Sequence, residues 1–181
     1  MVSIIDNFYS QRDLERMIYF SMYSVYRVRH QPVKTEFASR LHTYPVHETE
    51  MFLEKDEAFQ MFKKTFENRT NLKIDKLETF IRKIFKHEIE VSAYSDRNES
   101  SVHVDDKEMD LAGVIYYNAP NFKAGTKIYQ FLDDPEPSAV VGAFPNRCVF
   151  YSTKQPHSAG IDLRQNERIV QPFFIKLKKE N

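Results

Sequence analysis

Short runs of β-forming residues follow one another through the second half of the chain, and this pattern restricts its fold most. After about residue 72 these runs read "KLETFIRKIF", "EIEVSAYS", "SVHVD", "LAGVIYYN", "TKIYQF", "SAVVGAF", "RCVFYST" and "RIVQPFFIKL". Turn-forming residues separate several of them, at "NAPNFKAG", "DDPEPS" and "KQPHSAG". Many short strands in this order are typical of a barrel or a double-sheet jelly roll. We therefore predict a β core over about residues 72–178.

Two helices are predicted before this core. Ser10 and Asp13 resemble the N-cap of a helix over about 11–24, whose apolar face carries, at helical spacing, Leu14, Met17, Ile18 and Met22. A second helix over about 54–68 places Phe59, Phe62 and Phe66 on one face. The segment between them, "RLHTYPVHETE", is predicted to be irregular because a proline disfavours helix at the residue before it. The predicted fold class is α+β, with a helical N-terminal part over 1–70.

Composition favours an ordinary globular protein. A length of 181 residues suits one domain over 1–181, and 41% hydrophobic with 29% charged residues is usual for such a domain. A formal net charge of +0 argues against a general attraction to nucleic acid or to an anionic membrane. We expect neither a membrane span nor a secretory signal, since "MVSIIDNFYS" has no basic region before an apolar stretch. A single cysteine, Cys148, fits a reducing cytoplasm, so we predict a cytoplasmic location.

His103 and Asp105 are candidate metal ligands. In a strand, residues two apart point to the same face, so this imidazole and this carboxylate would aim at one point. His157 follows a predicted strand in "FYSTKQPHSAG" and could supply a third ligand from a neighbouring segment. Two histidines and one carboxylate with open positions form the ligand set of non-haem Fe(II) oxygenases. The alternative interpretations are a surface hydrogen bond between His103 and Asp105 and a polar turn histidine at 157.

Arg168 and two tyrosines are candidate binding residues. Arg168 lies in "NERIVQPFFIK" among apolar neighbours, and a buried arginine requires a partner. Its planar guanidinium suits a carboxylate held by two hydrogen bonds, on a ligand or on the protein itself. The phenols of Tyr94 and Tyr116 could also donate to a bound carboxylate, or these side chains could simply pack in the core.

The order of these residues resembles the 2-oxoglutarate- and Fe(II)-dependent dioxygenase superfamily, and most of all its prolyl-hydroxylase-like branch. The resemblance runs from Tyr94 through His103-Val-Asp105, "GVIYYN", "AGTKIY" and "NRCVFYSTKQPHSAG" to Arg168, about residues 90–176. It implies a double-stranded β-helix, a cupin-like jelly roll, with the N-terminal helices packed on one sheet. It also implies hydroxylation of a substrate, with O2 as oxidant and with succinate and CO2 released from 2-oxoglutarate.

The resemblance implies a role for each candidate residue. His103, Asp105 and His157 would hold Fe(II), and Arg168 would bind the far carboxylate of 2-oxoglutarate. Tyr116 is a second candidate for that carboxylate, and Tyr94 a weaker one for the cosubstrate or substrate. Retention of Asp105 favours hydroxylation, because halogenating relatives lose the carboxylate ligand.

Several positions depart from the family pattern. Ala124-Gly125 stands for the usual Gly-Gly turn, and Arg164 competes with Arg168 for the cosubstrate. Val170 occupies the position, two residues after the arginine, where relatives often carry Ser or Thr. We prefer Arg168 because Arg164 lies in the polar, loop-like stretch "DLRQNE".

The substrate is left open between a peptidyl residue and a small molecule, with no strong indication of nucleic acid. His42 and His47 are candidate substrate contacts or ordinary surface residues. Oligomeric state cannot be read from the pattern. Two other functions compete: a non-catalytic cupin-like protein that binds a metal or small molecule, and an interaction module whose ligand motif is vestigial.

Overall fold

The computed structural model describes residues 2–30, 45–87, 102–105, 108–118, 120–160, 162 and 166–179. Two α-helices and eleven strands occur in these ranges. In chain order they are β1 Val2–Ile5, α1 Gln11–Tyr23, β2 Arg27–His30, β3 Pro45–Glu48, α2 Glu57–Thr70, β4 Ile74–Thr79, β5 Arg82–Phe85, β6 Leu111–Tyr116, β7 Asn121–Ile128, β8 Ala139–Ala143, β9 Cys148–Ser152, β10 His157–Ala159 and β11 Glu167–Leu177.

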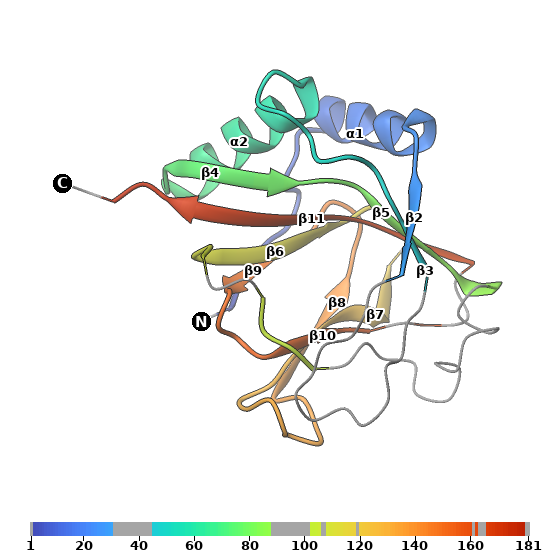
Figure 1. Cartoon of the computed structure of the whole chain (residues 1–181), viewed down its shortest axis with the longest axis vertical. Helices are drawn as coiled ribbons and strands as arrows, with labels where there is room; N and C mark the ends of the chain where they lie inside the picture. The colour runs from blue at the N-terminus through green and yellow to red at the C-terminus, as the bar shows by residue number, and fades with distance from the viewer. Residues whose placement is uncertain are drawn as a thin grey trace.

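Three layers build the described part of the chain (Figure 1). The middle layer is an antiparallel sheet in the order β1-β9-β6-β11-β5-β3-β2, and β4 also pairs with β11. Helices α1 and α2 lie on one side of this large sheet, and a small sheet in the order β10-β7-β8 lies on the other. Two facing antiparallel sheets agree with the predicted jelly roll, and the helices cover one face as expected.

Both helices form where the sequence predicts them. The Ser10 side chain caps α1 by accepting a hydrogen bond from the Asp13 backbone N–H at 3.2 Å. The apolar face of α1 is only partly used, since Met17 is fully buried whereas Met22 is 63% exposed. Met22 therefore lies on the solvent side of α1, although its neighbour Ser21 is buried.

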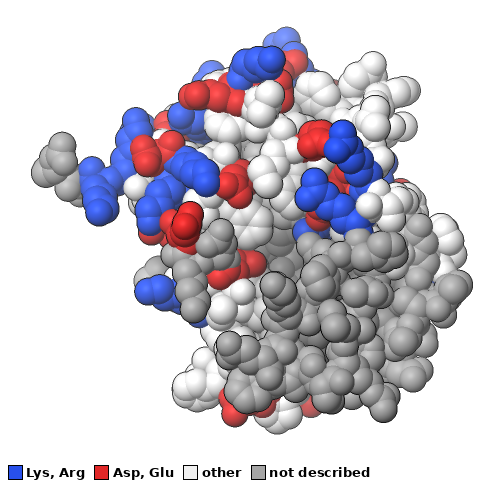
Figure 2. All heavy atoms as spheres, in the orientation of Figure 1, with Lys and Arg blue, Asp and Glu red and all other residues white. Residues whose placement is uncertain are grey.

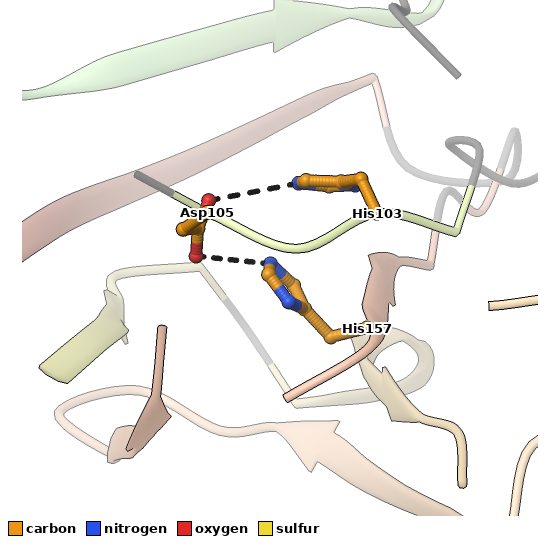
Figure 3. Close-up of side chains that lie close together, drawn as sticks. All are labelled: His103, Asp105 and His157. Atoms are coloured by element: carbon orange, nitrogen blue, oxygen red, sulfur yellow. Dashed lines mark ion pairs between the residues drawn. The ribbon is translucent and has the colours of Figure 1, made fainter. Parts of the chain in front are cut away.

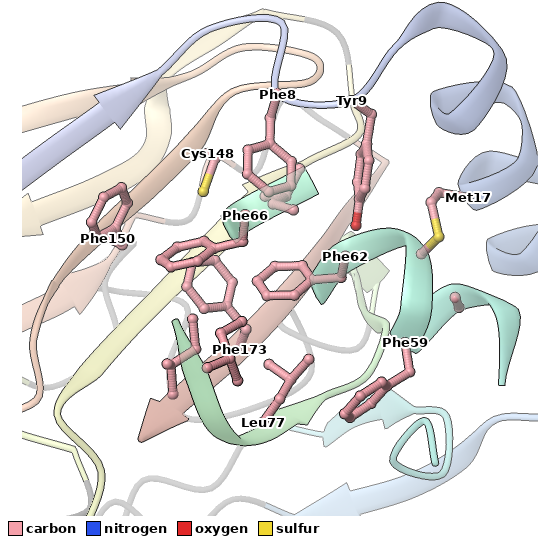
Figure 4. Packing of buried hydrophobic residues seen from close by; sticks show 14 of the residues in the cluster. Phe8, Tyr9, Met17, Phe59, Phe62, Phe66, Leu77, Cys148, Phe150 and Phe173 are labelled. Atoms are coloured by element: carbon pink, nitrogen blue, oxygen red, sulfur yellow. The ribbon is translucent and has the colours of Figure 1, made fainter. Parts of the chain in front are cut away.

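Aromatic side chains fill the layer between the helices and the large sheet. Phe62 and Phe66 of α2 point down onto Phe173 of β11, with ring centroids 4.8 Å and 5.9 Å from it (Figure 4). Phe150 of β9 contacts Phe66 edge to face at 5.3 Å. Helical spacing puts the phenylalanines of α2 on one face of the helix, and strand alternation puts Phe150 and Phe173 on one face of the sheet. These two faces pack against each other in the cluster.

Truncation of this cluster is expected to destabilise the fold strongly. Phe62 is 0% exposed, so Phe62→Ala should lower the free energy of unfolding by about 3–5 kcal/mol through lost burial and a residual cavity. Phe131→Ala is the matched control, because Phe131 is 58% exposed and its loss should change stability by less than about 0.5 kcal/mol. Urea denaturation measures both, and equal effects would contradict the packing described here.

A second apolar cluster lies between the two sheets. Alternate residues of β6, β9 and β11 turn away from the helices and meet residues of β7 and β8, and together they are Ala112, Val114, Tyr116, Ile128, Val141, Ala143, Val149, Tyr151 and Val170. Their intervening neighbours, such as Ile115 and Phe150, belong to the helix side. We call the face that carries the second cluster the inner face, and it forms the floor of the candidate site.

Four described segments differ from the sequence prediction. Pro45 begins strand β3 instead of an irregular segment, because its missing N–H is tolerated at the first residue of a strand. The predicted turn "NAPNFKAG" contributes the first residues of β7, and the predicted turn "KQPHSAG" contributes the short strand β10. "SVHVD" is reduced to one isolated bridge at His103, and "EIEVSAYS" lies outside the described residues.

Charged side chains are mixed in sign on the face drawn in Figure 2, where lysines and arginines lie beside aspartates and glutamates. Ion pairs join charges of opposite sign in the described residues, such as Arg82 with the buried Glu48 at 2.6 Å and Lys176 with Asp110 at 3.1 Å. The local pattern thus matches the balanced charge of the whole sequence. Neither of the two described helices combines the length and hydropathy that a bilayer-spanning helix needs.

Candidate metal centre

An isolated antiparallel bridge brings the two candidate histidines together. The His103 and His157 backbones exchange both N–H to C=O hydrogen bonds, each at 2.9 Å. Residues paired in this way carry their side chains on the same face. The two imidazole rings consequently lie side by side, with centroids 4.4 Å apart.

Asp105 completes the group from the same segment as His103. Its backbone N–H donates to the Thr153 carbonyl at 3.0 Å, which fixes the Asp105 backbone beside the segment that leads to His157. Its two carboxylate oxygens then face the two rings, at 3.8 Å from His103 Nε2 and 3.4 Å from His157 Nε2 (Figure 3). The candidate ligand atoms of the three residues all lie within 4.8 Å of one another.

His157 is held in the form that binds metals. Its Nδ1 lies 2.9 Å from the Gln155 carbonyl oxygen. Because a carbonyl only accepts, Nδ1 carries the proton and Nε2 presents its lone pair toward Asp105. Burial, and then the neighbouring His103, lower the pKa of His157 to about 3, so the ring is neutral at pH 7. A neutral imidazole with a fixed second nitrogen is a typical metal ligand.

The three side chains fit an octahedral ion with one face open. Metal–ligand bonds of about 2.1 Å at right angles place neighbouring donor atoms about 3 Å apart. The separations here, 3.8 Å from His103 to Oδ1 and 3.4 Å from His157 to Oδ2 of Asp105, end on different oxygens, so the carboxylate would rotate to bring one oxygen toward both rings when an ion binds. Nitrogen and oxygen donors without a thiolate suit Fe(II).

Arg168 and Tyr116 lie on the inner face of the large sheet. Arg168 stands two residues before Val170, which pairs directly with Tyr116 across β11 and β6. The Arg168 Nε donates to the Ala124 carbonyl of β7 at 3.1 Å, so the buried guanidinium reaches from the large sheet to the small one. Its central carbon lies 5.7 Å from the centre of the Tyr116 ring. The sequence therefore correctly predicted burial of Arg168.

Two inner-face residues escaped the sequence analysis. The Tyr151 ring lies 4.5 Å from that of His157, and the pKa of its phenol is raised by burial and then by the charge of Asp105. Thr126 of β7 forms a hydrogen bond with the Tyr116 hydroxyl. Strand alternation could have found both, since Tyr151 follows Val149 by two residues and Thr126 precedes Ile128 by two.

The remaining candidates are His47 and three residues that the structure does not describe. Tyr94, Arg164 and His42 lie outside the described residues. His47 is directly paired with Lys83, which in turn pairs with Ile169, so it is on the sheet face opposite to Arg168. There its ring packs edge-on against Phe85, with centroids 4.8 Å apart. His47 thus packs on the face of the large sheet opposite to the inner face, which we call the outer face. Among the described residues it is not part of the candidate site.

No family model matches the sequence, and no curated protein matches it. The solved structures do give matches. An oxidoreductase of the 2OG-Fe(II) oxygenase family from Burkholderia pseudomallei has a TM-score of 0.67 at 10% identity, over 97% of this chain and 84% of that one. A Pseudomonas putida prolyl-4-hydroxylase has a TM-score of 0.60 at 12% identity, over 98% and 93%.

A third neighbour is a Trichoplax adhaerens prolyl hydroxylase in complex with a peptide fragment of a hypoxia inducible factor, with a TM-score of 0.59 at 13% identity over 97% of this chain and 83% of that one. These likenesses arise at identities too low to transfer an activity, and they span almost all of this chain. The resemblance predicted from the sequence is confirmed in three dimensions: the chain has the fold of the 2OG-Fe(II) oxygenases, prolyl-4-hydroxylases among them.

Proposed function

We propose that this protein is a non-haem Fe(II)- and 2-oxoglutarate-dependent dioxygenase that hydroxylates its substrate and releases succinate and CO2. The observation that carries the proposal is the convergence of His103, Asp105 and His157 on the inner side of this fold. We further propose that residues 1–181 form one catalytic domain and that its two sheets are the halves of a double-stranded β-helix.

The chain's own residues would bind, orient and shield. His103, Asp105 and His157 would hold the iron, which when bound with 2-oxoglutarate and O2 supplies the oxidising power that no side chain has. Arg168 and Tyr116 would fix the far carboxylate of 2-oxoglutarate by charge and by a phenolic hydrogen bond. Tyr151 and Val149 give the inner face an apolar wall that keeps water from the reacting centre.

A peptidyl substrate is the first candidate, and a small molecule the second. The peptide bound to the Trichoplax neighbour supports the first, since that protein holds it on the same fold. The formal net charge of +0 gives no support to a nucleic acid.

The proposal is tested by 2-oxoglutarate turnover in the absence of added substrate. Protein with Fe(II), 2-oxoglutarate, O2 and ascorbate, which supplies the two electrons that a substrate would otherwise give, should form succinate slowly, and omission of Fe(II), 2-oxoglutarate or O2 should stop it. A cupin-like binding protein would instead bind the metal and form no succinate with any substrate screened. A vestigial motif would give identical melting curves with and without Fe(II).

A further inference from the structure

The large sheet ends on an open edge at β2. Strand β2 pairs with β3 on one side, and no strand of the described residues pairs with its other side. In an antiparallel pair, alternate residues direct their backbone N–H and C=O groups away from the partner strand. Within the described part of the chain, β2 therefore offers backbone donors and acceptors to an incoming strand.

Charged residues of alternating sign cross the sheet toward this edge. Arg27 of β2 pairs directly with Glu48 of β3, and Glu48 pairs directly with Arg82 of β5. Arg82 in turn pairs with Val170, whose side chain belongs to the inner face, so the whole row lies on that face. From β5 outward the row reads cation, anion, cation, and it ends on a cation at the open edge.

The glutamate in this row is already paired on both of its oxygens. Glu48 is buried, and its Oε1 lies 2.8 Å from Nε and 2.6 Å from Nη2 of Arg82. Its Oε2 lies 3.4 Å from Nε of Arg29, which shares the inner face with Arg27 because the two are two residues apart in β2. Arg27 pairs instead with the exposed Glu50, at 2.8 Å. Three arginines thus share two glutamates, which leaves one positive charge in excess at the edge.

The exposed side chains of β2 define what an incoming strand would meet. Those of Arg27 and Arg29 are 71% and 52% exposed, and Val28 between them lies on the outer face and is 55% exposed. Directly opposed side chains of neighbouring strands lie about 4.5–5.5 Å apart, where opposite charges attract and like charges repel. An extended segment with an acidic residue opposite each arginine and an apolar residue opposite Val28 therefore fits this edge.

A second copy of the chain fits the same edge poorly. Antiparallel pairing of β2 with β2 of another copy would place inner-face residues opposite inner-face residues. The described side chains on that face of β2 are Arg27 and Arg29, so arginine would face arginine. Charges on an edge strand also prevent unselective pairing. The edge is thus selective for acidic strands.

We propose that β2 is a docking strand for an extended acidic segment of a partner protein, which adds to the large sheet with its carboxylates toward Arg27 and Arg29. In strand addition of this kind, main-chain hydrogen bonds give affinity and alternate side chains give specificity. The inference is independent of the metal centre and of the proposed oxidation, because no residue of that site takes part.

The first test measures binding of a short fluorescent peptide with the central sequence Glu-Val-Glu to the unmodified protein, by fluorescence anisotropy. This peptide should bind, and a matched Lys-Val-Lys peptide should bind at least about tenfold more weakly. N-methylation of one alternate set of backbone nitrogens in the acidic peptide should cost at least about tenfold, and methylation of the other set much less, because only one set can donate to β2. Hydrogen–deuterium exchange should slow across residues 27–30 when the acidic peptide binds.

Charge reversal at the edge is the second test. Arg27→Glu should lower affinity for the acidic peptide by at least about tenfold and raise affinity for the lysine peptide by a similar factor. Arg12→Glu is the matched control, because Arg12 is exposed in the first turn of α1 and its reversal should change neither affinity. If Arg27→Glu does not fold, Arg27→Gln replaces it and should weaken the acidic peptide by about two- to fivefold.

Four results would overturn the inference. Undetectable binding of the acidic peptide to the folded protein would mean that the arginines only protect the edge. Equal effects of the two N-methylated sets would mean charge attraction without strand pairing. Unchanged affinity in the Arg27 variant would place the peptide elsewhere. A dimer in sedimentation experiments that the acidic peptide does not dissociate would assign the edge to a second copy, and none of the four would alter the expected formation of succinate.

Discussion

Replacing His157 with alanine is expected to weaken metal binding by more than roughly a hundredfold. Altering only a partner of a metal ligand typically costs ten- to a hundredfold in affinity, and here a ligand itself is lost. His157 is also the buried member of the group, with its Nδ1 hydrogen held by Gln155 and its Nε2 facing Asp105. The His157 side chain is therefore already fixed in the metal-free protein, so it loses little conformational entropy when a metal binds.

Titration with Mn(II), followed by electron paramagnetic resonance, measures this effect. The weak visible absorption band expected from Fe(II) with 2-oxoglutarate should disappear in the same variant. His47→Ala is the matched control, because its ring packs against Phe85 on the outer face of the sheet. A Mn(II) affinity for His157→Ala equal to that of the control would mean that the ion sits elsewhere.

Replacing Arg168 with alanine is expected to raise the 2-oxoglutarate dissociation constant by roughly a hundredfold, with Mn(II) affinity unchanged. Charge-assisted hydrogen bonds contribute about 1.5–3 kcal/mol each, and the guanidinium offers its donors to a carboxylate in a buried setting. Removal of the side chain would also cut the link from β11 to the Ala124 carbonyl of β7. Some loss of thermal stability should accompany the loss of affinity.

Calorimetry on the Mn(II)-loaded variant separates the two effects. Arg168→Lys keeps the charge without the planar fork and should lie between the alanine variant and the unmodified protein. Arg16→Ala serves as the control, since Arg16 pairs with Glu57 between the two helices. Full retention of 2-oxoglutarate affinity in Arg168→Ala would remove this arginine from the site and return attention to Arg164.

The site was predictable wherever spacing alone fixes which way a side chain points. His103 and Asp105 are two apart, and this spacing brings both to one face even though the described residues 102–105 form only one bridge. Arg168 lies in an apolar strand, which indicated its burial. The two helices and most strands could also be predicted, because apolar residues recur with a different period in a helix than in a strand.

The rest depended on pairings between distant segments. Pro45 begins a strand because β3 pairs with β2 on one side and with β5 on the other. No local sequence pattern predicts these pairings. His157 was expected in a turn, but pairing with β7 and with His103 draws it into β10. Strand alternation puts Tyr151 on the same face as Val149, but only the fold places its ring against His157.

The most direct test of the central claim is a crystal structure with Mn(II) and 2-oxoglutarate, in which the metal is located by its anomalous scattering. The account predicts one strong peak about 2.2 Å from His103, Asp105 and His157, with the far carboxylate of 2-oxoglutarate against Arg168. A peak bound by other residues, or none while the three side chains turn apart, would contradict it.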